Sequence, residues 1–495
     1  MIKKNLPNWL IIVILLVLIF RIPTLFMPYS YGDETIYLTL GEGIRQNLVL
    51  YKDIHDNKPP LIYIVAAIVV NLTYFKLFLA IWNIATIIVF WNLANKLFAS
   101  KESVPKVATI IFAILTNLPL LEGNIVNSEI LMIGPITLSF LILLSSKPTT
   151  KNLIISGIIF SIAVLFKLPA IFDLPAIIFF WLLISKKIDI HNLKVIFKRT
   201  FFFCLGVSLP IILTFVWYAA RGALFDYVKA AFLENIGYLS SWNPSSKTQP
   251  FLVKNGPLLI RAAIVFLGLS IIYTFRKKIP KNFAFASGWL LLSLFGATLS
   301  GRPYPHYLVQ AIPSISILLA ILFSGEGLVQ SLTIIPLTLA FFVPVYFKFW
   351  YYPSLPFYIN FINFVTNKIT KDEYINNFNK NMARNYALAQ FIKITTSKNE
   401  RVFVWGDDAK IYALSKRLPP IKYIADYHIK DFSNKSVVAK QIIEARPKIV
   451  IFLSESEPFL ELEDWLKKNY LKIQIPKVEH TTRIYVLPSS KVASL

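Results

Sequence analysis

The chain has 495 residues, of which 56% are hydrophobic and only 16% charged, with a mean hydropathy of +0.59. A water-soluble protein could not bury that much apolar surface, so the composition indicates an integral membrane protein. The net charge of +24 does not indicate nucleic-acid binding, because the basic residues lie between apolar runs and form no basic patch. The single cysteine, Cys204, excludes an intramolecular disulfide and a cysteine-based metal site.

Eleven apolar runs are long enough to cross a bilayer core of about 30 Å as helices. The first follows two lysines but has no small-residue cleavage site, so we expect a retained helix and not a signal peptide. The stretch 60–70 would rise only about 18 Å as a helix, so we expect it in the interface or re-entrant. The predicted spans are 9–28, 77–97, 104–121, 127–145, 152–167, 169–185, 199–220, 257–275, 283–300, 307–324 and 328–349.

Lysine and arginine gather in alternate connections, and short cytoplasmic loops carry such an excess. With the N-terminus inside, the inner connections hold Lys3 and Lys4; Lys96, Lys101 and Lys106; Lys147 and Lys151; Lys186, Lys187, Lys194, Lys198 and Arg199; and Arg276, Lys277, Lys278 and Lys281. The outer connections are sparser in both residues. We therefore predict a multi-pass protein of the plasma membrane, with a cytoplasmic N-terminus and an extracytoplasmic C-terminal domain.

The predicted fold is a polytopic α-helical membrane protein with a small C-terminal α/β domain. We expect a transmembrane domain over 1–350, whose first outer loop covers 29–76, an interfacial linker over 351–398, and the α/β domain over 399–495. The tail alternates strands with helices, and Asp407 and Asp408 are interpreted as caps of the helix that follows them. Its predicted strands are 401–405, 421–424, 448–453 and 482–487, and its other helices lie near 437–444 and 459–469.

The first outer loop has the densest set of polar groups beside the membrane. Apolar residues at 36, 37, 40 and 44 share one helical face, so we expect an amphipathic helix lying flat on the membrane after Asp33. Asp33 could be only an N-cap and Glu34 only a first-turn acid. Alternatively, a carboxylate held there could accept a proton from an attacking hydroxyl. The spacing alone leaves both readings open.

Further polar groups lie at the predicted outer ends of apolar runs. Lys58 is either a snorkelling lysine or a cation that Pro59 fixes beside a lipid phosphate. The others are Glu129, Lys167, Arg302, Tyr304 and His306. Each taken singly is an ordinary snorkelling or capping residue, but together they place three cations and a histidine on the side of Asp33, as a functional site would.

The family resemblance rests on the order of several short motifs: Asp33-Glu34, His55-Asp56-Asn57-Lys58-Pro59-Pro60-Leu61, Glu129, Phe166-Lys167-Leu168-Pro169-Ala170 and Pro305-His306-Tyr307. In this order and predicted sidedness the chain resembles the lipid-linked-sugar glycosyltransferases of the GT-C superfamily. The resemblance covers essentially the whole chain and is strongest to bacterial relatives of protein O-mannosyltransferases and of the lipid A aminoarabinose transferase. The stretch 404–420 is similar to the tail domain of uncharacterised bacterial members.

The resemblance implies a polyprenyl-phosphate sugar donor, an inverting transfer to an acceptor hydroxyl, and Asp33 as the catalytic carboxylate with Glu34 beside it. It implies substrate contacts for His55, Lys58, Glu129, Lys167, Arg302, Tyr304 and His306. The sugar and the acceptor, whether lipid, glycan or protein, stay open. We expect no strict metal requirement, although Glu34 and Glu129 could hold a divalent cation.

A lipid-carbohydrate transporter or flippase is the main alternative function. It would surround a midplane cavity with charged residues and break helices in matched halves, whereas this sequence places its charges at helix ends and has no internal repeat. An O-antigen polymerase or ligase would carry its main outer loop late in the chain. A plain membrane anchor would not explain the outer cluster of polar residues.

Overall fold

The computed structural model describes residues 6–145, 148–185, 187, 189–236, 251–406 and 408–488. Three residues named above, Lys147, Lys186 and Asp407, lie outside this part, as do Lys3, Lys4 and residues 237–250 of the predicted outer connection. The chain packs as two compact units. Unit 1 comprises 1–24, 76–220 and 231–354, and unit 2 comprises 25–75, 221–230 and 355–495. The boundaries predicted from the sequence stay predictions, whereas the packing units are discontinuous along the chain.

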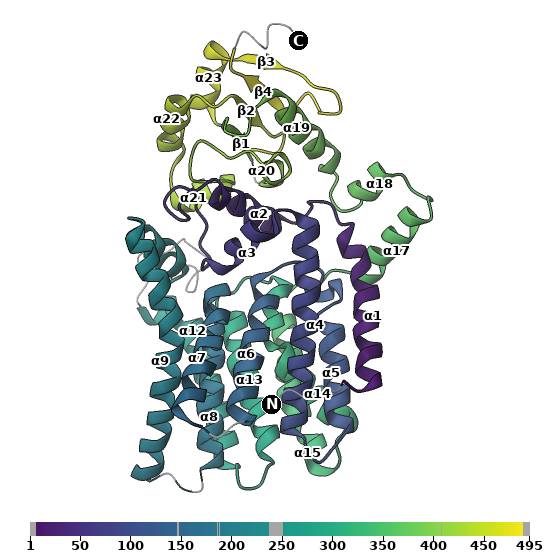
Figure 1. Cartoon of the computed structure of the whole chain (residues 1–495), viewed down its shortest axis with the longest axis vertical. Coiled ribbons are helices and arrows are strands. Elements are labelled where there is room, and N and C mark those ends of the chain that lie inside the picture. Colours follow the sequence, from purple (N-terminus) through teal and green to yellow (C-terminus); the bar gives the residue numbers. More distant parts are fainter. Residues whose placement is uncertain are drawn as a thin grey trace. The chain divides into compact units, whose positions relative to one another are not determined.

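Unit 1 is a bundle of helices, with α1 and α4 reaching a few residues beyond it (Figure 1). Its elements are α1 (Asn8–Leu25), α4 (Leu72–Leu97), α5 (Ser103–Leu115), η1 (Pro119–Leu121), α6 (Ser128–Ser145), α7 (Thr150–Phe166), η2 (Leu168–Asp173), α8 (Leu174–Ile184), α9 (Ile190–Ala220), α12 (Phe251–Thr274), α13 (Lys281–Thr298), η4 (Pro305–Ala311), α14 (Ile312–Ser324), α15 (Gly327–Leu332) and α16 (Ile334–Tyr346). Each predicted span coincides with one of these helices or with two consecutive ones, because apolar length selects helix in a bilayer.

Seven helical segments in the described part are long and apolar enough to cross a membrane: Asn8–Leu25, Leu72–Leu97, Ser128–Ser145, Ile190–Ala220, Asn255–Thr274, Pro305–Ser324 and Gly327–Tyr346. Shorter apolar helices include Ser103–Leu115, Thr150–Phe166 and Leu168–Ile184. The central helix is α13, which packs against α8, α12, α14 and α16 and has 15 of its 18 residues buried. These features make the chain a multi-pass membrane protein.

Helices α7 and α9 cross at two glycines. A Cβ on Gly157 would lie 2.2 Å from the carbonyl oxygen of Phe203, and one on Gly206 would lie 2.2 Å from that of Ile154. Real Cβ atoms do not approach backbone that closely, so only glycine fits at either position. Small residues at a crossing let membrane helices pack backbone to backbone.

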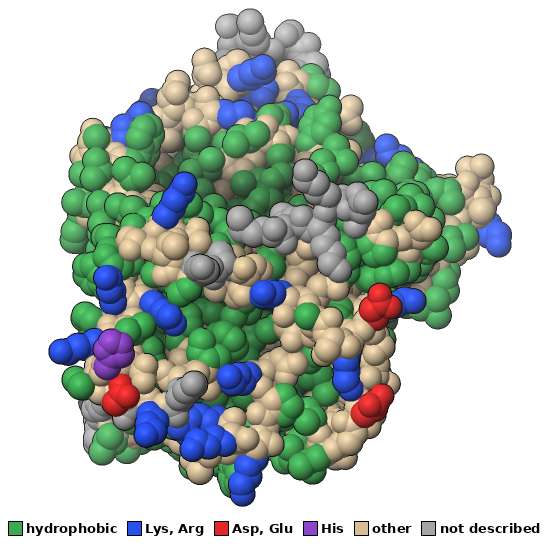
Figure 2. All heavy atoms as spheres, turned by 60° about the horizontal axis from the view of Figure 1, so that its bottom comes forward, with side chains coloured by type: hydrophobic (Ala, Val, Ile, Leu, Met, Phe, Trp, Pro, Cys, Tyr) green, Lys and Arg blue, Asp and Glu red, His purple; other side chains and the backbone are tan. Residues whose placement is uncertain are grey.

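Basic side chains gather at the end of unit 1 that carries α15 (Figure 2). Exposed residues include Lys101, Lys194, Lys198 and Lys277, all from connections that the sequence assigns to the cytoplasm. A cluster of this kind is what the lysine and arginine bias of cytoplasmic loops produces. The orientation itself stays a prediction.

Single-cysteine labelling tests that orientation. With Cys204 replaced by alanine, a cysteine at exposed Ser103 should be protected from an impermeant thiol reagent on intact cells. A cysteine at exposed Lys468 should react, because it lies in the C-terminal domain that we expect outside. Both positions should react in permeabilised cells, which controls for accessibility. Labelling of intact cells at Ser103 but not at Lys468 would reverse the orientation.

Unit 2 begins with the first predicted outer loop, which contains α2 (Gly32–Arg45) and α3 (Leu61–Val69). The nine residues of α3 confirm that 60–70 is too short to cross a membrane, since they span only about 14 Å. The expected amphipathic helix exists as α2, but every residue from Glu34 to Gly41 is buried. Helix α2 packs against α3 and α20, so it is a core element of unit 2 and not a helix with one free face.

The remaining elements of unit 2 follow later in the chain. They are α10 (Leu224–Val228), η3 (Lys229–Leu233, which ends in unit 1), α17 (Ser354–Val365), α18 (Lys371–Asn376), α19 (Met382–Thr395), β1 (Val402–Trp405), α20 (Lys410–Ser415), α21 (Asp426–Phe432), α22 (Lys435–Ala445), β2 (Ile449–Phe452), α23 (Leu460–Asn469), β3 (Leu471–Ile473) and β4 (Arg483–Val486). The sheet order is β1-β2-β4-β3, with β1 and β2 parallel and the other pairs antiparallel (Figure 1). Trp405, Phe452, Val438 and Leu462 belong to its core.

Three of the four predicted strands are confirmed, and the strand predicted at 421–424 is wrong. Ile421 and Tyr423 are apolar because they pack in the core of the domain, not because they alternate along a strand. The carbonyl oxygen of Lys422 accepts a hydrogen bond of 2.9 Å from the backbone N–H of His55, outside any sheet. Helix α21 and strand β3 were not predicted.

A charged network joins α19 to the loops that follow β1, β2 and β3. Buried Arg384 donates to both carboxylate oxygens of Glu455, at 2.6 and 2.8 Å, and to Glu479 at 3.1 Å. It also lies 3.9 Å from Asp408, which accepts the backbone N–H of Lys410 at the start of α20. Asp408 thus accepts a hydrogen bond from one of the free backbone N–H groups at the start of that helix, although the N-cap residue is Ala409.

Candidate active site

Asp33 lies in the first turn of α2. The N-cap is Tyr31, so the interpretation of Asp33 as the cap residue is wrong. A carboxylate in the first turn is still stabilised by the helix dipole, because the free backbone N–H groups point toward it. The side chain of Asp33 is 30% exposed. Its neighbour Glu34 is buried, with only 1% of the residue exposed. Asp33 is therefore the member of the acidic pair that can meet solvent or substrate.

The contacts of Asp33 come from its own helix and from the following loop. The hydroxyl of Tyr37, one turn along α2, donates to Asp33 Oδ2 at 2.9 Å. The amine of Lys58 lies 3.5 Å from the same oxygen and 5.2 Å from the ring centroid of Tyr37. This places a cation and a hydroxyl on one oxygen of the carboxylate, which fixes its orientation.

The loop that carries Lys58 is held by two tyrosines. The hydroxyl of Tyr51 donates to the Lys58 carbonyl at 2.8 Å, and the Lys58 N–H donates to the Tyr63 hydroxyl at 3.3 Å. Tyr63 in turn donates to Asp56 Oδ2 at 2.8 Å, and Lys58 Nζ lies 3.9 Å from that oxygen. We call Asp33, Tyr37, Asp56, Lys58 and Tyr63 the first-loop cluster.

Asp56 is an ionised carboxylate inside this cluster. Its burial opposes ionisation, but the charge of Lys58 and hydrogen bonds from Tyr63 and Asn57 outweigh burial and lower its pKa. The same burial, together with the Asp56 charge, raises the pKa of the Tyr63 hydroxyl well above its usual value. Tyr63 therefore acts as a hydrogen-bond donor and not as a base at neutral pH.

His55 points into the C-terminal part of unit 2. Its ring packs edge-on against Tyr423, His428 and Phe432, with centroid separations of 5.4, 6.2 and 4.8 Å. His55 was predicted as a substrate contact from its place in the motif. The structure places it in an aromatic cage, where it attaches the loop to the domain.

A second cluster forms in unit 1, where three of the predicted site residues come together. Lys167, which follows α7, forms an ion pair with Glu129 in the first turn of α6, and its amine lies 4.0 Å from the ring centroid of Tyr307. His306 of η4 places Nε2 3.6 Å from Glu129. Helix α7 ends just before Lys167, because Pro169 has no backbone N–H with which to continue its hydrogen bonds. Pro305 is the first residue of η4.

Glu122 also belongs to this group, although it was not among the predicted site residues. His306 Nδ1 lies 2.6 Å from Glu122 Oε2, which also accepts from Asn127 Nδ2 at 2.9 Å. Glu122 has φ +60°, a left-handed conformation that aims its side chain after the turn of η1. We call Glu122, Glu129, Lys167, His306 and Tyr307 the helix-end cluster. A buried glutamate between two spans was the available signal.

Tyr304 stacks on His306 at a centroid distance of 5.6 Å and an interplanar angle of 18°, and it packs edge-on against Trp350. Arg302 lies in the connection between α13 and η4, where its backbone N–H contacts the Ser300 hydroxyl at 3.3 Å. Tyr304 therefore adjoins the helix-end cluster, and Arg302 lies four residues before His306. Among the described residues, no group of three or more histidine, cysteine, aspartate or glutamate side chains could hold a metal ion.

Asp173, at the end of η2, is a second ionisable residue that the sequence reading missed. It is fully buried and accepts from Trp289 Nε1 at 2.7 Å, Ser293 Oγ at 2.6 Å and Gln310 Nε2 at 2.6 Å. These donors come from α13 and η4, so the carboxylate ties three elements of unit 1 together. An aspartate inside the apolar run 169–185 was the signal.

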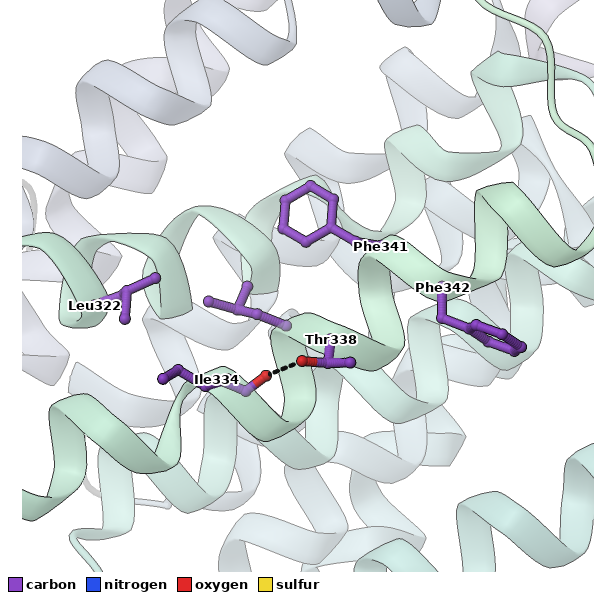
Figure 3. Close-up of a pocket in the computed structure, with 6 residues that line it drawn as sticks. Leu322, Ile334, Thr338, Phe341 and Phe342 are labelled. Atoms are coloured by element: carbon purple, nitrogen blue, oxygen red, sulfur yellow. Dashed lines mark hydrogen bonds between the residues drawn. The ribbon is translucent and has the colours of Figure 1, made fainter.

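An apolar groove also opens between α14 and α16 (Figure 3). Its volume is about 450 Å³, and its lining residues are Leu322, Ile334, Leu337, Thr338, Phe341 and Phe342. The hydroxyl of Thr338 donates to the Ile334 carbonyl at 2.8 Å, so the groove's side-chain polar group is engaged within the helix. The groove suits hydrocarbon and contains none of the predicted site residues.

Comparisons with known proteins bear on the fold. The family model "Putative competence-induced protein Ccs4 C-terminal domain" matches residues 382–489. The crystal structure of ArnT from Cupriavidus metallidurans bound to undecaprenyl phosphate is 13% identical, with a TM-score of 0.58 over 98% of each chain. The apo structure of the same protein is 12% identical, with a TM-score of 0.55 over 97% of each chain.

The oligosaccharyltransferase of Archaeoglobus fulgidus is 12% identical over 99% of this chain and 75% of its own, with a TM-score of 0.46. No curated protein sequence matches the chain. The chain thus shares the membrane fold of ArnT over nearly its full length. At this level of identity the likeness concerns the fold and not the activity.

Proposed function

We propose that the chain is a membrane glycosyltransferase that moves a sugar from a polyprenyl-phosphate donor to an acceptor hydroxyl, with inversion at the anomeric carbon. The fold likeness supports this proposal, because the similar ArnT structure is described as bound to undecaprenyl phosphate. The observation that carries it is Asp33. This carboxylate is partly exposed, oriented by Tyr37 and accompanied by the Lys58 cation.

The chemistry needs one base and one stabilised leaving group. The oxygen of the acceptor hydroxyl forms a bond to the anomeric carbon while the bond from that carbon to the phosphate oxygen breaks. Asp33 takes the hydroxyl proton, and the polyprenyl phosphate leaves with one additional negative charge. Charge is conserved, since the carboxylate becomes neutral as the phosphate gains its second charge. The reaction requires no oxidant or reductant.

Cations must meet the charge that develops on the phosphate. Lys58 of the first-loop cluster accompanies Asp33 and is the first candidate. Within unit 1, Lys167 of the helix-end cluster is a further candidate, and Arg302 lies four residues before His306 of that cluster. Fixed cations in a site bordered by lipid stabilise such a charge more strongly than water does. His306 and Tyr304 would orient the sugar or the phosphate by hydrogen bonding.

A transfer assay tests the proposal. Purified protein in lipid nanodiscs is given a membrane extract that contains labelled polyprenyl-phosphate sugars, and the label is followed from the lipid-phosphate pool into product. We expect one sugar class to disappear from that pool. The pool should stay intact with protein in which Asp33 is replaced by asparagine. Label that stays in the pool with folded wild-type protein would overturn the proposal.

Neutralising the three cations separately should weaken donor binding. Lys58→Gln, Lys167→Gln and Arg302→Gln should each raise the Kd for labelled polyprenyl phosphate by about tenfold or more, the scale of one charge-assisted contact. The matched control is Lys52→Gln, which removes an exposed lysine from the same loop as Lys58. Measurements with and without chelator test for a divalent cation. Unchanged affinity in all three variants would place the donor site elsewhere.

A further inference from the structure

One cation lies between two carboxylates in the first-loop cluster. The amine of Lys58 is 3.5 Å from Asp33 and 3.9 Å from Asp56, so neither aspartate holds it alone. The two distances are similar, so the two carboxylates attract the amine with similar strength. A change in the charge of either carboxylate therefore shifts the amine toward the other. Whatever lies behind Asp56 therefore influences Asp33.

His428 of α21 lies behind Asp56. Its Nε2 is 4.0 Å from Asp56 Oδ1, and its side chain is only 1% exposed. Neither ring nitrogen of His428 has a hydrogen-bond partner within the described part of the chain. Buried polar groups are nearly always hydrogen-bonded, so an unpaired imidazole beside a carboxylate calls for an explanation.

The charged and titratable groups around His428 are few. In the described part of the chain, those with the largest influence on it are Asp56, His55, Lys58 and Asp33, all from the first loop or the start of α2. The rings of Tyr427 and Phe432 are its other neighbours, at centroid separations of 4.4 and 6.3 Å. Burial lowers the pKa of His428 to about 4, and the nearby carboxylates only partly offset this effect. The imidazole is therefore neutral at neutral pH.

Backbone and aromatic contacts hold Asp56 beside His428. The hydrogen bond from the His55 N–H to the Lys422 carbonyl joins the loop to the segment before α21. The aromatic cage around the His55 ring includes His428 itself. The C-terminal domain thus holds the loop from Asp56 to Lys58 at a fixed distance from α21.

We propose that His428, which the C-terminal domain supplies, is a positioning residue that faces Asp56 and thereby sets how Lys58 is shared between Asp56 and Asp33. The inference rests on the proposed function of Asp33. A neutral imidazole whose N–H faces Asp56 stabilises that carboxylate without adding a full charge. Lys58 then stays available to Asp33 and to the donor phosphate. Without this N–H, Asp56 draws Lys58 toward itself.

The variants that test this idea act in opposite directions. In His428→Phe, Lys58 moves toward Asp56 and away from Asp33, so Asp33 ionises less readily and the acidic limb of the pH–rate profile shifts to higher pH. In Asp56→Asn, Lys58 pairs with Asp33 alone, so the acidic limb shifts to lower pH. The double variant should behave like Asp56→Asn, because His428 acts only through Asp56.

A second readout follows Lys58 directly and needs no sugar transfer. The rate of Lys58 acetylation at a fixed pH, measured by mass spectrometry, should fall by about threefold in His428→Phe, because the buried Asp56 carboxylate then holds the amine more closely. It should rise in Asp56→Asn, because one of the two carboxylates near the amine is lost. His428→Gln keeps an N–H donor and should stay near wild type in both readouts. The matched control is His480→Phe, an exposed histidine of the same domain.

The outcomes separate the two proposals. If His428→Phe matches His480→Phe in both readouts, or if the double variant shows the sum of the single effects, the role of His428 is refuted while Asp33 can still be the base. If acetylation changes as expected but wild-type protein transfers no sugar, the inference about Lys58 stands and the proposed function fails. Should His428→Phe not fold, an acetylation rate for His428→Gln at the wild-type level, with a raised rate in Asp56→Asn, supports the proposal, and a rate lowered by about threefold refutes it.

Discussion

Replacing Asp33 by asparagine is expected to lower sugar transfer by at least about a hundredfold, the scale of losing a general base. The change should leave the fold intact, because Tyr31 and not Asp33 is the N-cap of α2, and the asparagine carbonyl can still accept from Tyr37. Donor affinity should change little, since the partner of the carboxylate is the acceptor hydroxyl. The measurements are turnover in the transfer assay and the Kd for polyprenyl phosphate.

The neighbouring loop offers a matched control. Asp53→Asn makes the same substitution at an exposed carboxylate that accepts the backbone N–H of Val49, and asparagine can keep that bond. We expect near-normal transfer for this variant. If Asp33→Asn also transfers sugar at close to the original rate, Asp33 is only a charge near a helix terminus, and another base must be sought.

Replacing Arg384 by methionine is expected to destabilise the C-terminal domain by about 3 kcal/mol, the lower end of the range for breaking a buried ion pair. The lower end applies because Glu455 and Glu479 are 44% and 42% exposed, so water screens them after Arg384 is lost. Three carboxylates, Asp408, Glu455 and Glu479, would then lack their shared cation. Native-state proteolysis of the full chain measures this as about a hundredfold faster cleavage in the domain.

The control for this prediction is Arg446→Met, which removes an exposed arginine at the end of α22 and should leave cleavage unchanged. Acid gives a second check. The bond from Arg384 lowers the pKa of Glu455 to about 2, below its usual value of 4.5. Unfolded protein binds more protons in that window, so stability is present above pH 4.5 and lost as pH falls toward 2. Arg384→Met should flatten this dependence; equal acid sensitivity in both proteins would contradict it.

The helices of unit 1 could be predicted because a long apolar run in a bilayer has only one way to satisfy its backbone. The strand at 421–424 could not, since an apolar run of four residues has the same composition in a strand and in an irregular core segment. The burial of α2 on all sides could not be predicted from the sequence either. Its polar positions, such as Glu34 and Thr39, look solvent-facing in a helical projection, yet α3 and α20 pack around the helix.

The part of the candidate site formed by charged residues at helix ends could be predicted. Lys167, Glu129 and His306 were predicted as site residues from their places at the ends of apolar runs, and the structure places them in contact. Glu122 and His428 were missed for another reason. Each gains its role from a partner more than 150 residues away in sequence, His306 and Asp56 respectively, and no local pattern encodes such a pairing.

The glycine crossing of α7 and α9 has a mechanical consequence. With Gly157 against Phe203 and Gly206 against Ile154, neither helix can roll about its axis or shift by a turn unless its partner does the same. Lys167 comes directly after the last residue of α7, so two packed helices and not one fix the position of its backbone. In the proposed function, the phosphate of a lipid donor would therefore meet this amine at a position that two helices fix together.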